Sequence, residues 1–415
     1  MSRGSESVNI QYRVLSLLRD NGPLSRAQLA DRLEVPRPRL LGELDRMVAA
    51  GRVCEAGPAA SRGGRRSTLV RLDPGVRFAA VDLGASSIDI EITDGALAPV
   101  ASCSEPADIR SGPVAVLGRV SELLRTMAGQ GHYTQLDAIG IGLPGPVSFR
   151  EGVPVSPPIM VGWNRFPVRD TLSVAHGCPV VVDNDVNVMS LGEQHSGIAR
   201  TVDHLLFVKI GSGIGSGMQH HGRIYRGAEG CAGDIGHVQV EAEADGPVCS
   251  CGNTGCLEAY FGGAALSRDA TEAARSGRSP ALAERLAERG VLTALDVGEC
   301  ADGGDSTSVG LIRAGGHRVG QVLATLVSFM NPSMIVIGGG LTGLGYPLLA
   351  EIRSVVYKRS LPLATGNLPI VMSELGPRAG VVGAALLASE LAYGEASVAR
   401  GVPRGEAAGQ SALQH

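Results

Sequence analysis

Five short apolar segments in the chain each end in a turn rich in glycine or aspartate. They span residues 78–83, 138–143, 180–182, 205–210 and 334–337. Apolar runs of this length are typical of buried strands. Polar residues grouped at the carboxyl ends of such strands are where α/β proteins place ligands. The pattern therefore predicts an α/β fold whose ligand site is built from several strand ends.

The turns after these strands contain residue types that hold phosphate and metal ions. Asp82 and Gly84 follow the first strand, and an Asp-Asn-Asp sequence at residues 183–185 follows the third. The fourth strand runs into residues 211–217, which alternate glycine with serine or isoleucine. Such a loop can wrap a phosphate with its backbone N–H groups, although a glycine-rich hairpin uses the same residues. Three further glycines, residues 338–340, follow the last strand.

Three cysteines within eight residues form the most specific motif of the chain. Cys249, Cys251 and Cys256 are interspersed with two glycines, and His237 precedes the first of them by 12 residues. Three thiolates and one imidazole make a closed tetrahedral Zn²⁺ site of the structural kind. The alternative is a run of free or redox-active thiols.

Composition excludes several classes of protein. A hydrophobic content of 44% is too high for a disordered chain, and 8 cysteines in 415 residues are too few for a disulfide-rich mini-protein. No apolar run reaches the roughly 18 residues of a membrane helix, and residues 1–9 are polar, unlike a signal peptide. We therefore expect a soluble cytoplasmic protein with no membrane partner.

Charge is unevenly distributed along the chain. The first 78 residues carry 14 arginines, no lysine and 8 acidic residues, whereas the remainder has a balance of −10. A basic segment joined to an acidic body indicates that the segment meets a polyanion. A solvated, arginine-rich surface is the alternative.

The N-terminal segment has the pattern of a winged helix-turn-helix. Helical spacing predicts helices over residues 10–18, 25–33 and 36–50, followed by short strands at 52–55 and 67–72. Ser25 and Gln28 are spaced as a capping box at the start of the second helix. The residues expected on the buried face of the third helix are Leu40, Leu41, Leu44, Met47 and Val48.

In this motif the third helix enters the major groove of DNA with its N-terminal residues at the base edges. Arg37 and Arg39 occupy that position, and Arg62, Arg65 and Arg66 lie at the tip of the wing, within reach of the minor groove or phosphates. The sequence therefore predicts DNA binding. A winged helix that binds another protein is the alternative.

Together these motifs resemble the ROK family of repressors, uncharacterised reading frames and sugar kinases. The matching signature is Gly236-His237, followed by Cys249-x-Cys251-Gly252-x-x-Gly255-Cys256-x-Glu258. The resemblance covers roughly residues 77–392. With the winged helix it covers nearly the whole chain, as in the repressor branch.

The resemblance implies two actin/hexokinase-like lobes with sugar bound in the cleft. Asp185 matches the kinase general base, and His237 would bind zinc through one ring nitrogen and face the sugar through the other. The positions that match sugar contacts are Asn184, Asp185, Asp234, His237 and Glu258. The positions that match nucleotide or phosphate contacts are Asp82, Gly84, Gly211, Ser212, Gly213, Gly215, Gly338, Gly339 and Gly340.

Four positions depart from the kinase pattern. Ala85 and Ser86 stand where kinases carry Gly-Thr, Ser212 replaces threonine, and Asp234 replaces glutamate. A methyl group at Ala85 crowds the approach of a phosphate to the backbone. ATP and Mg²⁺ are therefore expected only if the chain is a kinase.

We expect three parts: a winged helix-turn-helix at 1–76, a ROK domain with structural Zn²⁺ at 77–394, and a disordered tail at 395–415. The expected function is a sugar-responsive transcriptional regulator, a repressor. It would bind a double-stranded DNA operator and a sugar or sugar phosphate, as a homodimer or homotetramer. The alternatives are an ATP-dependent kinase of a hexose or amino sugar, and a binding module with no role at DNA.

Overall fold

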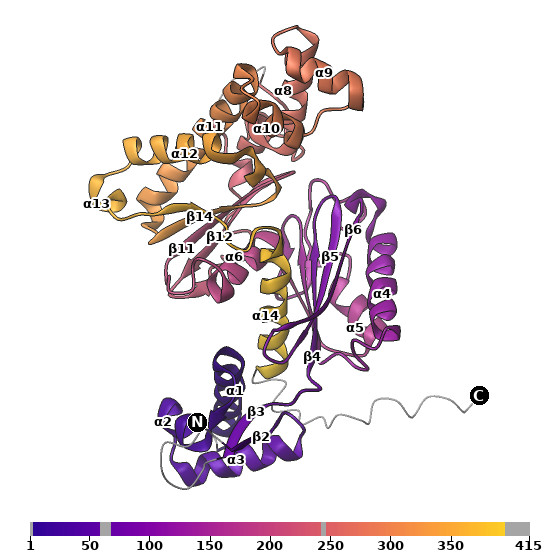
Figure 1. Ribbon diagram of the computed structural model, residues 1–415, viewed down its shortest axis with the longest axis vertical. Helices are drawn as coiled ribbons and strands as arrows, with labels where there is room; N and C mark the ends of the chain where they lie inside the picture. Colours follow the sequence, from indigo (N-terminus) through magenta and orange to yellow (C-terminus); the bar gives the residue numbers. More distant parts are fainter. Residues whose placement is uncertain (1–2, 59–67, 242–245, 395–415) are drawn as a thin grey trace, which may run out of the picture.

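The computed structural model describes residues 3–58, 68–241 and 246–394. An N-terminal module lies at one end of an elongated molecule, beneath two α/β lobes (Figure 1). The wing tip with Arg62, Arg65 and Arg66, and the tail at 395–415, lie outside the described residues. None of the described helices is long and apolar enough to cross a membrane.

The N-terminal module consists of three helices and a three-stranded sheet. Its elements are α1 (Arg3–Asn21), β1 (Leu24–Ser25), α2 (Arg26–Leu33), α3 (Arg37–Ala49), β2 (Val53–Pro58) and β3 (Thr68–Leu72). The predicted capping box is confirmed: Gln28 N donates to Ser25 Oγ at 3.2 Å, and Ser25 N donates to Gln28 Oε1 at 2.9 Å. Pro38 is tolerated in α3 because the first helical turn needs no hydrogen bond from its nitrogen.

The structure corrects the sequence prediction for the module in three places. The first helix begins at Arg3 rather than near Ile10, and β1 pairs with β3, which no local pattern indicated. Leu41 and Val48 are not on the buried face of α3, being 37% and 44% exposed. The buried face is therefore narrower than predicted, and the opposite face of α3 is open to a partner.

The first lobe is built on a sheet with strand order β10-β7-β4-β5-β6. β4, β7 and β10 are parallel, and β5 and β6 continue from β4 as an antiparallel meander. Its elements are β4 (Arg77–Leu83), β5 (Ser87–Asp94), β6 (Pro99–Pro106), η1 (Ile109–Ser111), α4 (Pro113–Gly129), β7 (Ala138–Leu143), β8 (Val147–Ser148), β9 (Val153–Pro154), α5 (Val168–His176), β10 (Val180–Asn184) and α6 (Asp185–Ser196).

The second lobe repeats this plan with strand order β13-β12-β11-β14-β15. Its first part comprises β11 (Leu205–Ile210), β12 (Ile214–His220), β13 (Arg223–Ile224), η2 (Ile235–His237), α7 (Leu257–Phe261), α8 (Gly263–Arg275), α9 (Pro280–Arg289) and α10 (Ala294–Asp302). The remainder comprises α11 (Ser306–Met330), β14 (Met334–Gly338), η3 (Gly340–Leu344), α12 (Gly345–Arg359), α13 (Pro362–Thr365), β15 (Ile370–Met372) and η4 (Gly376–Arg378). The last helix, α14 (Ala379–Tyr393), returns to pack on β4 and β7 of the first lobe.

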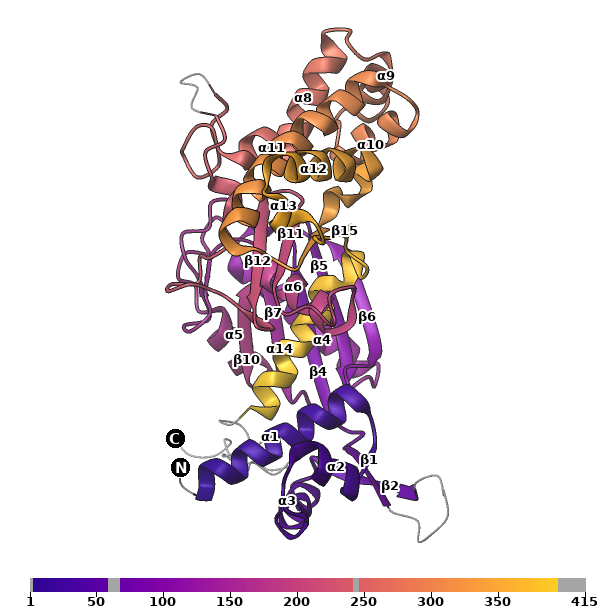
Figure 2. The same cartoon turned by 90° about the vertical axis from the view of Figure 1, so that its left-hand side faces the viewer.

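Helices α6 and α14 lie side by side between the two sheets, and α14 extends from there down to the N-terminal module (Figures 1 and 2). Glycines allow this close approach. A Cβ atom on Gly383 would lie 1.8 Å from the carbonyl oxygen of Val188, and one on Gly192 would lie 2.2 Å from that of Ala379. The chain therefore places a single C-terminal helix against both lobes and the module.

We expect Gly383→Ala to destabilise the protein by roughly 1–3 kcal/mol, because the added methyl group has no space and must push the two helices apart. The matched control is Gly118→Ala on α4, where an added Cβ meets no atom within 4 Å. This control should be neutral or stabilising, since alanine favours a helix. Chemical denaturation of both variants measures the difference, and equal stability of the two would contradict the packing described here.

Candidate functional site

A cleft of about 840 Å³ lies between the lobes, where the strand ends converge. The predicted residues that line it are Asp82, Gly84, Asn184, Asp185, Gly211, Ser212, Gly213, Gly215, Asp234, His237, Glu258, Gly339 and Gly340. Of the residues expected to contact sugar or nucleotide, only Gly338 is absent from the lining. A Cβ on Gly338 would lie 2.4 Å from the Phe207 ring, so this glycine is required by packing within the sheet.

Asp185 begins α6 and is buried, with 3% exposure. Its carboxylate pairs with the ammonium group of Lys209 on β11. Burial alone would lower the pKa of Lys209, but the carboxylates of Asp185, Asp82 and Glu258 raise it above the usual value. Asp185 therefore faces a lysine that remains charged, and one of its two carboxylate oxygens, Oδ2, is already engaged by this ammonium group.

Asp82, at the end of β4, lies beside the first turn of α14. A Cβ atom on Gly380 would be 1.9 Å from Asp82 Oδ2. Burial raises the pKa of Asp82 to about 7, although Lys209 opposes this shift. A carboxyl group in this position is a suitable Mg²⁺ ligand. The cation that acts on it among the described residues, Lys209, is already paired with Asp185.

The predicted phosphate loop at 211–217 is shorter than expected. Only Gly211, Ser212 and Gly213 form the turn, whereas Gly215 and Gly217 belong to β12 and pack against α6. Gly211 N donates to Gly213 O at 2.9 Å, and Ile214 N donates to Glu258 Oε2 at 3.0 Å. Two backbone N–H groups of this hairpin thus already have acceptors within the protein, which weakens its fit to an ATP phosphate.

The other predicted sugar contacts divide into two groups. Asn184 caps α6 through its Oδ1 and donates from Nδ2 to Gly145 O at 2.8 Å, so its side chain is engaged in holding the turn. Asp234 lies near His237, with Oδ1 at 3.9 Å from Nε2. Burial raises the pKa of Asp234, and His237 partly offsets the shift. Asp234, His237 and Glu258 thus present polar groups to the cleft.

The Cys/His cluster has the geometry that a tetrahedral metal site requires. One ligand atom from each of His237, Cys249, Cys251 and Cys256 lies within 4.8 Å of the others. Cys251 Sγ and Cys256 Sγ are 3.7 Å apart, and Cys249 Sγ is 3.4 Å from His237 Nδ1. For Zn–S of about 2.3 Å and Zn–N of about 2.0–2.1 Å, a tetrahedron gives about 3.8 and 3.6 Å. The four residues therefore fit a zinc ion.

At the other end of the molecule, Arg37 is the first residue of α3 and is exposed, while Arg39 is half-buried. Both lie at the N-terminal end of the helix predicted to read DNA. The exposed leucine of α3, Leu41, lies on the next turn. The site that DNA would meet on α3 is therefore accessible in the described part of the chain.

Sequence analysis missed two charged residues at the cleft and a second ion pair beside it. Lys209 was visible as a lone lysine on an apolar strand directly before the glycine turn. Arg226, in the loop after β13, donates to the buried Asp183 at 2.6 Å and stacks on Phe149 at 3.9 Å. Arg110 also lines the cleft, paired with Asp108. No local motif marks Arg226, because its partner Asp183 lies on β10, 43 positions away. The partner of Arg110 is local, but nothing in that pair indicates that it lines the cleft.

Comparison with known proteins places this architecture in a family. Residues 78–391 match the ROK family. The chain belongs to the ROK family. A glucokinase from Halalkalibacterium halodurans is 32% identical over 315 residues, covering 75% of this chain and 95% of that enzyme. A xylose repressor from Caldicellulosiruptor bescii is 28% identical over 377 residues, covering 89% of this chain and 92% of the repressor.

A solved ROK family transcriptional regulator, described as a homologue of the E. coli MLC protein, is similar over the full length. Its TM-score is 0.80 at 26% identity, and the match covers 97% of this chain and 100% of that one. The regulators thus match the module as well as the ROK region, whereas the glucokinase matches only three quarters of the chain. The predicted two-lobed ROK fold and the repressor branch are both confirmed.

Proposed function

We propose that this ROK protein is a sugar-responsive, DNA-binding transcriptional regulator, a repressor whose cleft binds a sugar. The division into a winged helix-turn-helix at 1–76 and a ROK domain at 77–394 is part of this proposal. The observation that carries it is the path of α14, which begins at the cleft and ends on the N-terminal module.

At its upper end, α14 is in contact with the ligand site. Gly376 and Pro377, just before the helix, line the cleft, and Gly380 packs against Asp82. Arg378 donates to Glu91 of β5 at 2.9 Å. A ligand that shifts the lobes would therefore move the start of this helix.

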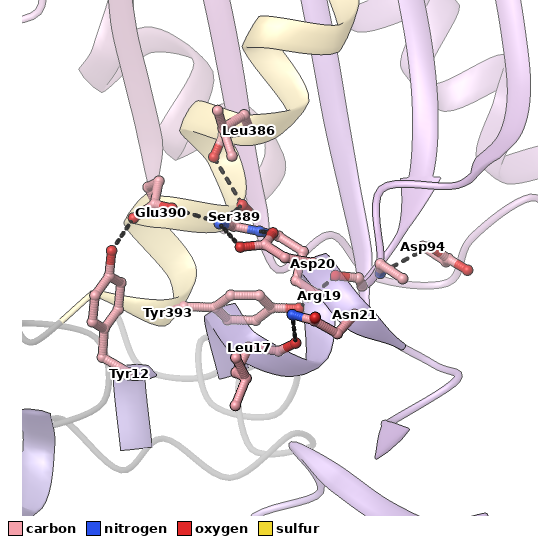
Figure 3. A network of polar contacts seen from close by, with 12 residues as sticks. Tyr12, Leu17, Arg19, Asp20, Asn21, Asp94, Leu386, Ser389, Glu390 and Tyr393 are labelled. Atoms are coloured by element: carbon pink, nitrogen blue, oxygen red, sulfur yellow. Dashed lines mark hydrogen bonds and ion pairs between the residues drawn. The ribbon is translucent and has the colours of Figure 1, made fainter. Parts of the chain in front are cut away.

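At its lower end, α14 holds α1 of the module through a polar network (Figure 3). Arg19 Nη1 lies 2.6 Å from Glu390 Oε1 and 2.8 Å from Ser389 Oγ, and its side chain is 5% exposed. Tyr12 donates its hydroxyl to Glu390 Oε2 at 2.5 Å. Because the arginine is buried against the helix, movement of α14 would reorient α1 and, with it, the recognition helix α3.

In this proposal the sugar lies against Asn184, Asp185, Asp234, His237 and Glu258. The cleft is lined by six carboxylate residues, namely Asp82, Asp89, Asp108, Asp185, Asp234 and Glu258. Lys209 and Arg110 are the lysine and arginine that line it within the described residues, and both are already paired with carboxylates. A neutral, polyhydroxylated sugar suits such a site, whereas a phosphate dianion is repelled.

We therefore expect neutral sugars to bind at least about tenfold more tightly than their phosphate esters, a difference of about 1.4 kcal/mol. A thermal-shift screen of hexoses, pentoses and amino sugars, each beside its phosphate, checks this, because a ligand of the folded state raises the melting temperature. Tighter binding of the phosphate esters would contradict the charge argument.

The zinc site is proposed to be structural. Zn²⁺ held by Cys249, Cys251, Cys256 and His237 Nδ1 would fix the loop that positions Glu258, and would orient His237 Nε2 toward the cleft. A tetrahedral site closed by four protein ligands leaves no position for substrate, so the metal supplies rigidity to the sugar site.

We expect Cys251→Ser to lose the bound zinc and, with it, most of the sugar affinity. Replacing one thiolate ligand by a hydroxyl weakens a Zn²⁺ site strongly, since the thiolate is the better ligand. Cys103→Ser on β6, outside the cluster, is the matched control and should keep one zinc per chain. Metal analysis and sugar titration measure both effects; a zinc-free variant that binds sugar normally would refute the role of the metal.

DNA binding is proposed to rest on Arg37 and Arg39 of α3 together with Arg62, Arg65 and Arg66 of the wing, in a homodimer or homotetramer on a two-fold operator. A gel shift with DNA upstream of the protein's own gene, at about 150 mM salt, tests this proposal. Specific retardation is expected. If the protein binds this DNA no more strongly than it binds unrelated DNA, the alternative of a binding module with no role at DNA is favoured.

A sugar kinase is the second candidate function. Asp185 and the glycine turns at the strand ends favour it. The Lys209 pair on Asp185 and the occupied N–H groups of the 211–213 turn count against it. If ATP and Mg²⁺ bind, Asp82 and the glycine turns are the residues that would hold them, and Mg²⁺ would neutralise the charge of the phosphates.

A further inference from the structure

Three histidines converge at the end of the β11–β12 hairpin that lies away from the cleft. His204 directly precedes β11, His220 is the last residue of β12, and His221 follows it in the turn to β13. Their ring centroids are 4.7 Å (His204–His220), 4.8 Å (His204–His221) and 4.2 Å (His220–His221) apart. One ring nitrogen from each lies within 4.8 Å of the others.

The backbone holds the three residues in place. His204 O accepts a hydrogen bond from Ser333 N at 2.8 Å, and the next residue, Leu205, is paired with Gln219 in the hairpin. His221 and Gly222 both have positive φ, +49° and +69°. A two-residue turn of this kind favours asparagine or aspartate before the glycine. Histidine is therefore an unusual residue at this position, and it sets the His221 imidazole beside that of His220.

These imidazoles make few interactions apart from their contacts with one another. Within the described residues, the three rings make ring contacts with one another and no side-chain hydrogen bond. Asp203 supplies a carboxylate nearby: its Oδ1 lies 3.9 Å from the position of a Cβ atom on Gly222. Three imidazoles and a neighbouring carboxylate form the donor set that binds divalent transition metals.

We propose that His204, His220 and His221 form a second metal site, which takes a divalent transition-metal ion such as Zn²⁺ or Ni²⁺. Metal–nitrogen bonds of about 2.0–2.1 Å place tetrahedral nitrogens about 3.4 Å apart. His220 and His221 are exposed, so rotation of their side chains can close the present spacing. Asp203 or water completes the coordination.

The site is independent of the Cys/His cluster and does not rest on the proposed regulatory function. It would join the start of β11 to the end of β12 and to the following turn. A metal here would therefore clamp the hairpin whose other end forms the glycine turn of the cleft, and its binding should raise the melting temperature of the folded chain.

The experiment uses the full, untagged chain carrying one tightly bound zinc per protomer. Titration with Zn²⁺ in a chelator buffer should show one additional equivalent in the wild type. The variant His220→Gln with His221→Asn should lose at least about tenfold in affinity for this second ion, a conservative bound for removing metal ligands. Asparagine is well tolerated at the positive φ of residue 221, so the turn should persist. His204→Gln is a second test that leaves the turn unchanged.

Two matched variants complete the design. His132→Gln removes a half-buried histidine that lies outside both clusters, and should bind the second ion as the wild type does. Cys251→Ser should lose the first zinc and retain the second. The proposal is overturned if the wild type, which already carries one zinc, binds no additional ion. It is also overturned if both histidine variants bind the additional ion with unchanged affinity.

Discussion

Replacing Arg19 by glutamate is expected to abolish the effect of sugar on DNA binding while leaving the cleft itself intact. Arg19 is a buried polar link between α1 and α14, bonded to Glu390, Ser389 and Asp20. A glutamate in its place would bring three carboxylates together, and an uncompensated buried charge costs about 3–5 kcal/mol. The contact between the helices would therefore open, although each lobe keeps its own core.

The measured quantity is the ratio of operator affinities with and without sugar. Couplings between sites are typically 1–3 kcal/mol, or about 5- to 150-fold in affinity. In Arg19→Glu this ratio should fall to near one, with sugar affinity close to that of the wild type. The reversed pair, Arg19→Glu with Glu390→Arg, should recover part of the response.

Two further variants serve as controls for a loss of response that is due only to unfolding. Arg278→Glu breaks an exposed ion pair with Glu272, whose side chains are 51% and 73% exposed, and should leave the response unchanged. Tyr12→Phe removes only the hydroxyl that donates to Glu390 and should weaken the response in part. A full sugar response in folded Arg19→Glu would show that the signal does not pass through this contact.

The second large effect is expected at Asp185. Asp185→Asn should weaken sugar binding by about 10- to 100-fold, because it removes a charged hydrogen-bond acceptor and leaves Lys209 without its partner in the cleft. Isothermal titration with the best neutral sugar measures this loss. The comparison is with the neighbouring ion pair between Arg226 and Asp183, whose residues do not line the cleft.

The same variant separates the regulator from the kinase. In a coupled assay of ATP consumption over hexoses and amino sugars, we expect the wild type to stay well below ~1 s⁻¹, the low end of ordinary enzymes. Turnover above this rate that disappears in Asp185→Asn even at saturating sugar would establish Asp185 as a working general base, and the receptor account of the cleft would then be wrong.

The sequence was informative where local chemistry determines structure. The Ser25–Gln28 capping box, the apolar strands with their polar ends, and the spacing of the Cys/His cluster all depend on residues close in the chain or on a specific motif. The site residues at these strand ends were therefore predicted to lie together, and all but Gly338 line the cleft.

What the sequence could not predict depends on contacts between distant residues. Leu41 and Val48 have helical spacing suited to burial, but no element covers that face of α3 in the described chain. The Lys209–Asp185 pair joins β11 to α6, and Arg19 meets Glu390 across 371 positions. Such pairings are fixed by tertiary packing, which local patterns do not encode.

The most direct test of the central idea is reciprocal linkage in the zinc-loaded wild type. The dissociation constant of the operator is measured with and without saturating neutral sugar, and that of the sugar with and without operator, at one salt concentration. Linkage between the sites requires the two ratios to be equal, and the account predicts equal ratios of at least about fivefold. Ratios of one in both directions would contradict the claim that sugar binding in the cleft controls the affinity of the N-terminal module for DNA.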